Sequence, residues 1–148
     1  MVSEFKIEID RPLKDVYAAF ANPENMPRWL HGLQRTEQIK GKPGQVGSQM
    51  RMIYLERGKT VELIETITAH EPMKYMKGVL TGPGIESAIH MEYVDRGDKT
   101  TVISRSEWQS KGIMMAIMKP FIKNQVRKRQ GGDLQRFKKL MEAGELAG

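Results

Sequence analysis

A series of short alternating segments, each ended by a turn signal, occupies residues 33–109 and constrains the fold more than any other feature. Glycine, proline and aspartate cluster along it, and these residues favour tight turns because of their backbone preferences. The turn signals lie at residues 41–44, 57–59, 70–72, 82–84 and 95–98. We expect strands between them, near 33–40, 47–56, 60–69, 73–81, 85–94 and 100–109. Because consecutive strands joined by tight turns run in opposite directions, the sequence predicts an antiparallel sheet.

The N-terminal segment adds one strand and two short helices to this meander. Residues 3–10 alternate apolar and charged side chains, as a strand with one wet face does. Apolar residues then recur at helical spacing over 13–20. The helix should stop at Asn22, because a proline disfavours helix in the residue before it. A short second helix is expected at about 24–30.

Helical spacing returns after residue 112 and continues almost to the last residue. Pro120 and the pair Gly131-Gly132 interrupt this stretch, and we expect a bend or a weak point there. The order of elements predicts an α+β fold, in which a seven-stranded antiparallel sheet wraps around the long C-terminal helix. Because one helix and two short ones cannot fill a curved sheet, a cavity between sheet and helix is expected.

The composition fits a single domain covering residues 1–148. The absence of cysteine excludes a disulfide framework, a thiolate metal site and a cysteine nucleophile. No stretch approaches the roughly 18 consecutive apolar residues of a membrane span, and the first ten residues lack the apolar core of a signal peptide. We therefore expect a cytoplasmic protein.

The net charge of +6 is confined to the C-terminal segment. Residues 1–110 hold 15 basic and 15 acidic residues, whereas residues 111–148 hold 9 basic and 3 acidic ones. A basic amphipathic helix can make peripheral contact with an anionic membrane; the simpler interpretation is a charged solvent face. Nucleic-acid binding is not expected, because the sheet lacks surface aromatics alternating with basic residues.

The passage between the first two strands carries the most specific signal. Residues 11–20, RPLKDVYAAF, are followed by the run 22–29, NPENMPRW. This passage resembles the signature of the START/Bet v 1-like (SRPBCC) superfamily, in its bacterial polyketide cyclase/dehydrase-like branch, and the similarity extends over nearly the whole chain. The resemblance implies the helix-grip fold with a tunnel or cavity for a hydrophobic ligand. It supplies no catalytic motif, because the superfamily includes carriers, receptors and enzymes.

The alternation within each strand predicts which side chains face the cavity. In the last strand, Arg105 and Glu107 belong in water, which turns the serines and the tryptophan of that strand inward. Alternation in the other strands, together with apolar residues of the short second helix and the C-terminal helix, predicts a ligand-binding set: Trp29, Met50, Met52, Tyr54, Glu65, Ile89, Met91, Tyr93, Ser104, Ser106, Trp108, Met114, Met118 and Phe121. The two serines either hydrogen-bond a ligand or bond locally or to solvent. Methionine adapts to ligands of varied shape, but it also fills gaps in ordinary cores.

Glu65 is the one acidic residue that stands out as a catalytic candidate. If its neighbours Leu63 and Ile67 point inward, Glu65 points inward with them. An apolar environment would raise the pKa of its carboxyl group, which could then act as an acid or a base. The alternative is a register break, because Ile64 lies on the opposite face of the same strand.

The three histidines do not suggest a metal site. His31, His70 and His90 are expected in a loop, in a turn and at an outward-facing strand position, without a second ligand at metal spacing. No cofactor is expected either.

Three functions remain in competition. The leading hypothesis is non-catalytic binding or transport of a small hydrophobic molecule, such as a lipid, a quinone or a polyketide-like compound, by a monomer or a homodimer. The second is an enzyme of the cyclase, aromatase or dehydratase type that uses Glu65, or Tyr54 and Tyr93, as acid–base groups. The third is a protein-interaction module whose cavity is filled.

Overall fold

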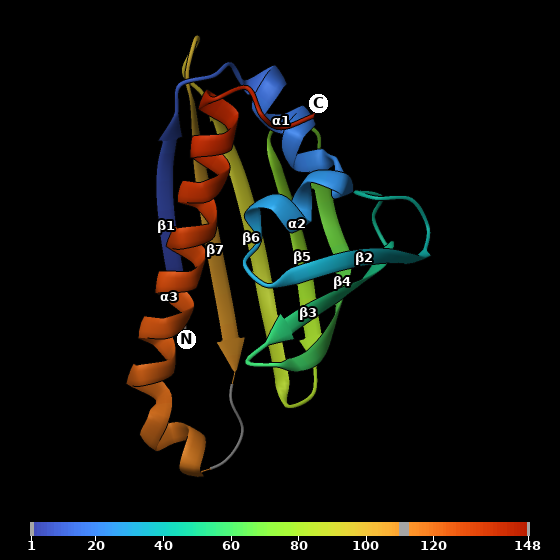
Figure 1. The fold of residues 1–148 in the computed structure, drawn as a ribbon, viewed down its shortest axis with the longest axis vertical. Helices are drawn as coiled ribbons and strands as arrows, with labels where there is room; N and C mark the ends of the chain where they lie inside the picture. The colour runs from blue at the N-terminus through green and yellow to red at the C-terminus, as the bar shows by residue number, and fades with distance from the viewer. Residues whose placement is uncertain (1, 110–112, 148) are drawn as a thin grey trace.

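The computed structural model describes residues 2–109 and 113–147, and the side chains of these residues except for 113–122. Its helices and strands follow one another in the order that the sequence predicts (Figure 1). They are β1 (Val2–Ile9), α1 (Leu13–Ala21), the 3₁₀ turn η1 (Pro23–Asn25), α2 (Met26–Trp29), β2 (Leu33–Lys40), β3 (Gln49–Glu56), β4 (Lys59–Glu71), β5 (Tyr75–Gly82), β6 (Ile85–Asp95), β7 (Thr100–Gln109) and α3 (Ile113–Glu142).

The seven strands form one antiparallel sheet in the order β1-β7-β6-β5-β4-β3-β2. Strands β2 to β7 each pair with their neighbours in the chain, and β1 closes the order by pairing with β7. The sheet curves strongly, so that β2 and β3 cross the direction of β6 and β7, while α3 runs along β1 and β7 (Figure 1). The predicted α+β, helix-grip architecture is confirmed.

The two short helices arise from one proline. Asn22 adopts an extended conformation (φ −90°, ψ 109°), as the residue before Pro23 must, and α1 ends there. The Asn22 side chain then accepts a hydrogen bond from the backbone amide of Glu24 at 3.1 Å and starts the next turn. As a result α1 and α2 lie beside α3 over the same face of the sheet (Figure 1).

A tightly packed core joins α1, α2, α3 and the adjoining strands. Phe137 of α3 is fully buried, and its ring stacks on Phe20 with the ring centroids 3.7 Å apart. Trp29 meets both rings edge to face, at 5.2 Å from Phe20 and 5.4 Å from Phe137. The other buried members of this cluster are Ile9, Val16, Ala19, Val102, Leu134 and Met141.

The glycine pair, where the sequence predicts a bend or a weak point, lies inside α3. The helix is continuous from Ile113 to Glu142. Gly131 is instead explained by packing, because a Cβ atom built on it would lie 2.8 Å from Cε2 of Phe5 on β1. Among the residues that the structure describes, no atom outside the helix lies within 4 Å of the corresponding position at Gly132. The missing side chain at Gly131 therefore lets α3 approach the sheet closely.

Charged side chains tie α3 to the loop between α2 and β2. Asp133 accepts hydrogen bonds from the backbone amide of His31 at 3.0 Å and from Arg136 at 3.1 Å. Arg136 also donates to the carbonyl of Trp29 at 2.8 Å. Arg129 donates to the carbonyl of His31 at 2.8 Å and pairs with Glu56. Two of the arginines of the basic segment thus bind α3 to the end of α2 and the loop that follows it.

The rest of the basic segment lies largely on the outer side of α3. Lys123, Arg127, Lys128 and Lys139 are exposed, and the side chain of Lys119 lies outside the described residues. In the part of the chain that the structure describes, no helix has the length and apolarity needed to cross a membrane. Peripheral contact with a membrane surface stays a prediction.

Candidate functional site

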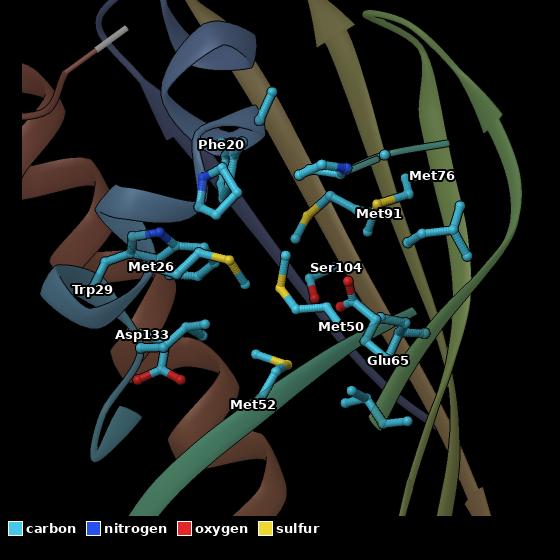
Figure 2. Close-up of a pocket in the computed structure, with 18 of the residues that line it drawn as sticks. Phe20, Met26, Trp29, Met50, Met52, Glu65, Met76, Met91, Ser104 and Asp133 are labelled. Atoms are coloured by element: carbon cyan, nitrogen blue, oxygen red, sulfur yellow. The ribbon is translucent and has the colours of Figure 1, made fainter. Parts of the chain in front are cut away.

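A cavity of about 260 Å³ lies between the curved sheet and the three helices (Figure 2). It reaches the surface between the end of α1 and the β2–β3 loop, where the lining residues Ala21 and Pro43 are exposed. Its wall is mainly apolar, with a few polar groups. The lining residues are Tyr17, Phe20, Ala21, Pro23, Met26, Trp29, Leu30, Pro43, Gly44, Met50, Met52, Tyr54, Glu65, Ile67, His70, Met76, Leu80, Ile89, His90, Met91, Tyr93, Ser104, Gln130, Asp133 and Leu134.

Methionines from four elements form much of the wall. Met50 and Met52 come from β3, Met76 from β5, Met91 from β6 and Met26 from α2. Their side chains converge on one space, facing Phe20 and Trp29 (Figure 2). Because methionine is unbranched and polarizable, such a wall can adjust to apolar ligands of different shape.

Nine residues of the predicted ligand-binding set line this cavity: Trp29, Met50, Met52, Tyr54, Glu65, Ile89, Met91, Tyr93 and Ser104. The register of the sheet explains their shared face, since Ser104 pairs with Met91, and Tyr93 with Val102. Ser106 and Trp108 follow on the same face of β7, but they are not among the lining residues. Met114, Met118 and Phe121 lie outside the residues whose side chains are described. A role in ligand binding stays a prediction for the whole set.

Glu65 points into the cavity from β4 (Figure 2). The ladder with β3 is regular around it, with Glu65 opposite Met50 and Ile64 opposite Arg51, so the register break considered above does not occur. Burial among apolar side chains raises the pKa of the Glu65 carboxyl to about 7. Close to neutral pH this group can therefore either hold or release a proton.

Ser104 forms hydrogen bonds with a side chain of α3, and not only with its own strand or with solvent. Its Oγ and its carbonyl oxygen accept hydrogen bonds from Nε2 of Gln130 on α3, at 2.8 and 2.9 Å. The amide oxygen of Gln130 in turn accepts a hydrogen bond from Ser3 at 2.9 Å. This short chain joins β1, β7 and α3 at the cavity wall and fixes the Ser104 hydroxyl facing the cavity.

His70 enters the site through a bulge that sequence reasoning missed. In the β4–β5 ladder Ile67 pairs with Gly78, but the next pair is Ala69 with Lys77, so Thr68 is an extra residue. The bulge reverses the alternation and turns His70 to the inner face. There its Nε2 lies 3.1 Å from the hydroxyl of Tyr17, within hydrogen-bonding distance. His70 thus lies in a strand, not in the predicted turn, and lines the open end of the cavity beside Gly44.

The helices contribute further lining residues that the strand pattern could not reveal. Asp133 and Gln130 project from α3, and Tyr17 from α1. Burial raises the pKa of Asp133, and the hydrogen bonds from the His31 amide and Arg136 oppose this shift. Burial also raises the pKa of Tyr54 and Tyr93, which keeps both phenols neutral at physiological pH. Among the described residues, no group of three His, Asp or Glu side chains is placed to hold a metal ion.

A curved seven-stranded sheet that grips a long C-terminal helix and encloses an apolar cavity defines the helix-grip, Bet v 1-like class of fold. Within this class, the chain belongs to the family described as polyketide cyclase/dehydrase and lipid transport, whose model matches residues 2–142. A search of curated proteins gave no match.

Several solved structures share this fold. TTHA0849 from Thermus thermophilus is 13% identical with a TM-score of 0.80, over 97% of this chain and 99% of that one. The ZhuI aromatase/cyclase from Streptomyces sp. R1128 is 11% identical with a TM-score of 0.77, over 93% of this chain and 91% of that one. Ara h 8.0201 is 15% identical with a TM-score of 0.74, over 97% of this chain and 99% of that one. Identities this low show the fold alone.

Proposed function

We propose that this protein binds a small, mainly apolar molecule in the cavity between the sheet and the helices, as a carrier or a receptor. The observation that carries the proposal is the cavity itself, about 260 Å³ with a wall of methionine, aromatic and aliphatic side chains. Ligand pockets typically measure about 300–1,000 Å³, so this cavity suits a compact ligand of one or two rings or a short chain. The lipid-transport and cyclase members of the family support binding of such molecules.

Binding of a neutral fluorescent apolar probe, N-phenyl-1-naphthylamine, tests this proposal. We expect saturable fluorescence enhancement with one probe per chain, the stoichiometry being checked by native mass spectrometry. Met76→Trp places a large side chain in the cavity wall and should weaken binding at least tenfold. The matched control is Leu55→Trp, which adds a tryptophan at a position that is 48% exposed. It lies next to the inward-facing Tyr54 on β3, so its side chain points to the outer face.

The control variant should bind the probe within twofold of the wild type. If the wild-type protein shows no saturable binding, or if both tryptophan variants bind as it does, the cavity is not a ligand site.

One observation favours a second candidate function, proton transfer by Glu65 in an enzyme of the cyclase or dehydratase type. A carboxyl with a pKa of about 7 inside an apolar cavity is matched to acid–base work near neutral pH. The compound 5-nitrobenzisoxazole reports such a base directly. When a base removes the proton on its ring carbon, the N–O bond breaks and a coloured cyanophenolate forms.

Under this second candidate, the protein accelerates the reaction with an inflection near pH 7, and Glu65→Gln abolishes the acceleration. Glu62→Gln serves as the matched control, because Glu62 lies on the same strand with a side chain that is 59% exposed. Equal rates for the wild type and Glu65→Gln would leave carrier function as the only proposal.

A further inference from the structure

The charged groups of the cavity wall are of one sign. Two carboxyl groups, those of Glu65 and Asp133, are among its described lining residues, and neither lysine nor arginine is. Arg129 and Arg136 on α3 have partners of their own. Arg129 pairs with Glu56 and lies over the Tyr54 ring, 5.4 Å from its centroid, and Arg136 pairs with Asp133.

The two carboxyl groups differ in their partners. Asp133 already accepts hydrogen bonds from the His31 amide and from Arg136, so its charge is compensated by the protein. Glu65 has neither a hydrogen bond nor an ion pair with any residue that the structure describes. A carboxyl group that faces an apolar space without a partner is costly to ionise, and a partner brought by a ligand relieves that cost.

We propose that the ligand of this cavity carries a basic nitrogen that pairs with Glu65, while its apolar body lies against the methionines and aromatic rings. The inference rests on the ligand-binding role proposed above and adds the chemical class of the ligand. An ammonium group supplies the opposite charge and the hydrogen-bond donors that Glu65 lacks. A ligand carboxylate or phosphate would bring a second negative charge into the same apolar space and is rejected.

The other titratable groups that face the cavity set the conditions for a test. They are Tyr17 from α1, Tyr54 from β3, His70 from β4, Tyr93 from β6 and Asp133 from α3. His90 borders the cavity too, but it alternates with the inward-facing Met91 and pairs with Arg105, on the outer face of β6 as predicted. Burial raises the pKa of all three tyrosines, so they carry no charge at pH 8. Histidine ordinarily changes charge between pH 5 and 8. At pH 8, above the pKa of about 7 for Glu65, the carboxylate is the charge that an ammonium group meets.

Three ligands of the same shape separate charge from apolar fit: 3-phenylpropylamine, 3-phenylpropan-1-ol and 3-phenylpropanoate. Each is titrated at pH 8 against the complex with N-phenyl-1-naphthylamine, and its inhibition constant is measured from the loss of fluorescence. We expect the amine to displace the probe at a concentration at least tenfold lower than the alcohol, and the carboxylate to be the weakest. In Glu65→Gln the amine should lose this advantage to within threefold, while the alcohol is unchanged. Glu62→Gln, on the same strand but exposed, should retain the wild-type preference.

The outcomes distinguish the two proposals. If the probe itself does not bind, the proposed ligand-binding role fails and this inference falls with it. If the probe binds but the alcohol or the carboxylate displaces it as well as the amine, ligand binding stands and the preference for a basic nitrogen is overturned. An amine preference that persists in Glu65→Gln also overturns the inference, because the nitrogen then pairs elsewhere.

Discussion

The two halves of the space under the sheet are filled in opposite ways. Between α3, α1 and the strands β1 and β7, aromatic and aliphatic side chains form a buried cluster, in which Ile9, Val16 and Phe137 have no exposed surface. Under β3 to β6, methionines and other side chains surround a cavity of about 260 Å³. The same sheet face thus provides a packed core at one end and a hollow at the other.

The difference shows how a small domain can tolerate an internal hollow. Dense packing at the α3 end supplies contacts that the hollow end lacks. The hydrogen bonds from Gln130 to Ser104 and from Arg136 to Trp29 then fix α3 and α2 at the border between the two regions. Stability and ligand binding are therefore expected to respond to different residues.

Truncation of one large side chain in each region should give the clearest contrast. Phe137→Ala removes a fully buried ring that stacks on Phe20, and we expect a loss of about 3–5 kcal/mol in the free energy of unfolding. Met76 is only partly buried and already borders a hollow, so the loss for Met76→Ala should be no more than about 2 kcal/mol, the lower end of the range for this substitution. Urea denaturation of both variants at one pH measures the two values. Equal losses would mean that the cavity wall is as tightly packed as the core.

The ionisation of Glu65 should have the second largest effect on the free energy of unfolding. Its pKa rises from 4.5 in the unfolded chain to about 7 in the folded protein, so the folded state binds the proton more tightly. The free energy of unfolding therefore falls as the pH rises through the window from 4.5 to 7, and the full cost, about 3 kcal/mol, is present above pH 7. Glu65→Gln removes this cost. We therefore compare the free energies of unfolding of Glu65→Gln and the wild type. The difference in favour of the variant should be about 3 kcal/mol larger at pH 8.5 than at pH 4.

The change in the variant's relative stability between pH 4 and pH 8.5 reports on the carboxylate. Any effect of the amide on packing is the same at both pH values and cancels. Glu62→Gln, which changes an exposed carboxyl, should shift stability by less than about 1 kcal/mol at either pH. A Glu65→Gln variant with the same relative stability at pH 4 and pH 8.5 would show that Glu65 is hydrated.

The strand pattern predicted much of the fold and part of the candidate site. Alternation placed Ser104, Met91 and Met50 on the inner face, because side chains in a regular strand point to opposite sides in turn. It also placed Ser106 and Trp108 on that face, but it could not show that the cavity ends before them. The end of a cavity depends on how far each helix extends over the sheet. The alternation of side chains within a strand carries no information about this.

Two kinds of residue could not be found from the pattern. His70 faces inward because of the bulge at Thr68, and one extra residue in a strand leaves no clear mark in the sequence. Asp133 and Tyr17 come from helices whose rotation and position are fixed only by packing against the sheet. Backbone propensity alone predicts a weak point at the glycine pair, but it does not reveal that Gly131 packs against the ring of Phe5.

The smallest predicted effect on stability comes from alanine substitutions in the glycine pair of α3, where the helix packs on β1. Gly132 serves as the control for Gly131. Alanine is favoured over glycine inside a helix by about 1 kcal/mol. Gly132→Ala, with no atom outside the helix within 4 Å of the new Cβ, should gain up to about that amount in the free energy of unfolding. Gly131→Ala should lose about 1 kcal/mol instead, because its Cβ would lie 2.8 Å from the Phe5 ring and push α3 away from β1.

Thermal and urea denaturation of the two variants, compared under identical conditions, measure this difference. The double variant Phe5→Leu with Gly131→Ala sharpens the test, because a smaller side chain at position 5 should relieve the contact and recover most of the loss. If Gly131→Ala and Gly132→Ala stabilise the protein equally, α3 does not need the close approach to β1. The dense region would then tolerate displacement of its central helix, and the contrast between packed core and hollow would lose its structural basis.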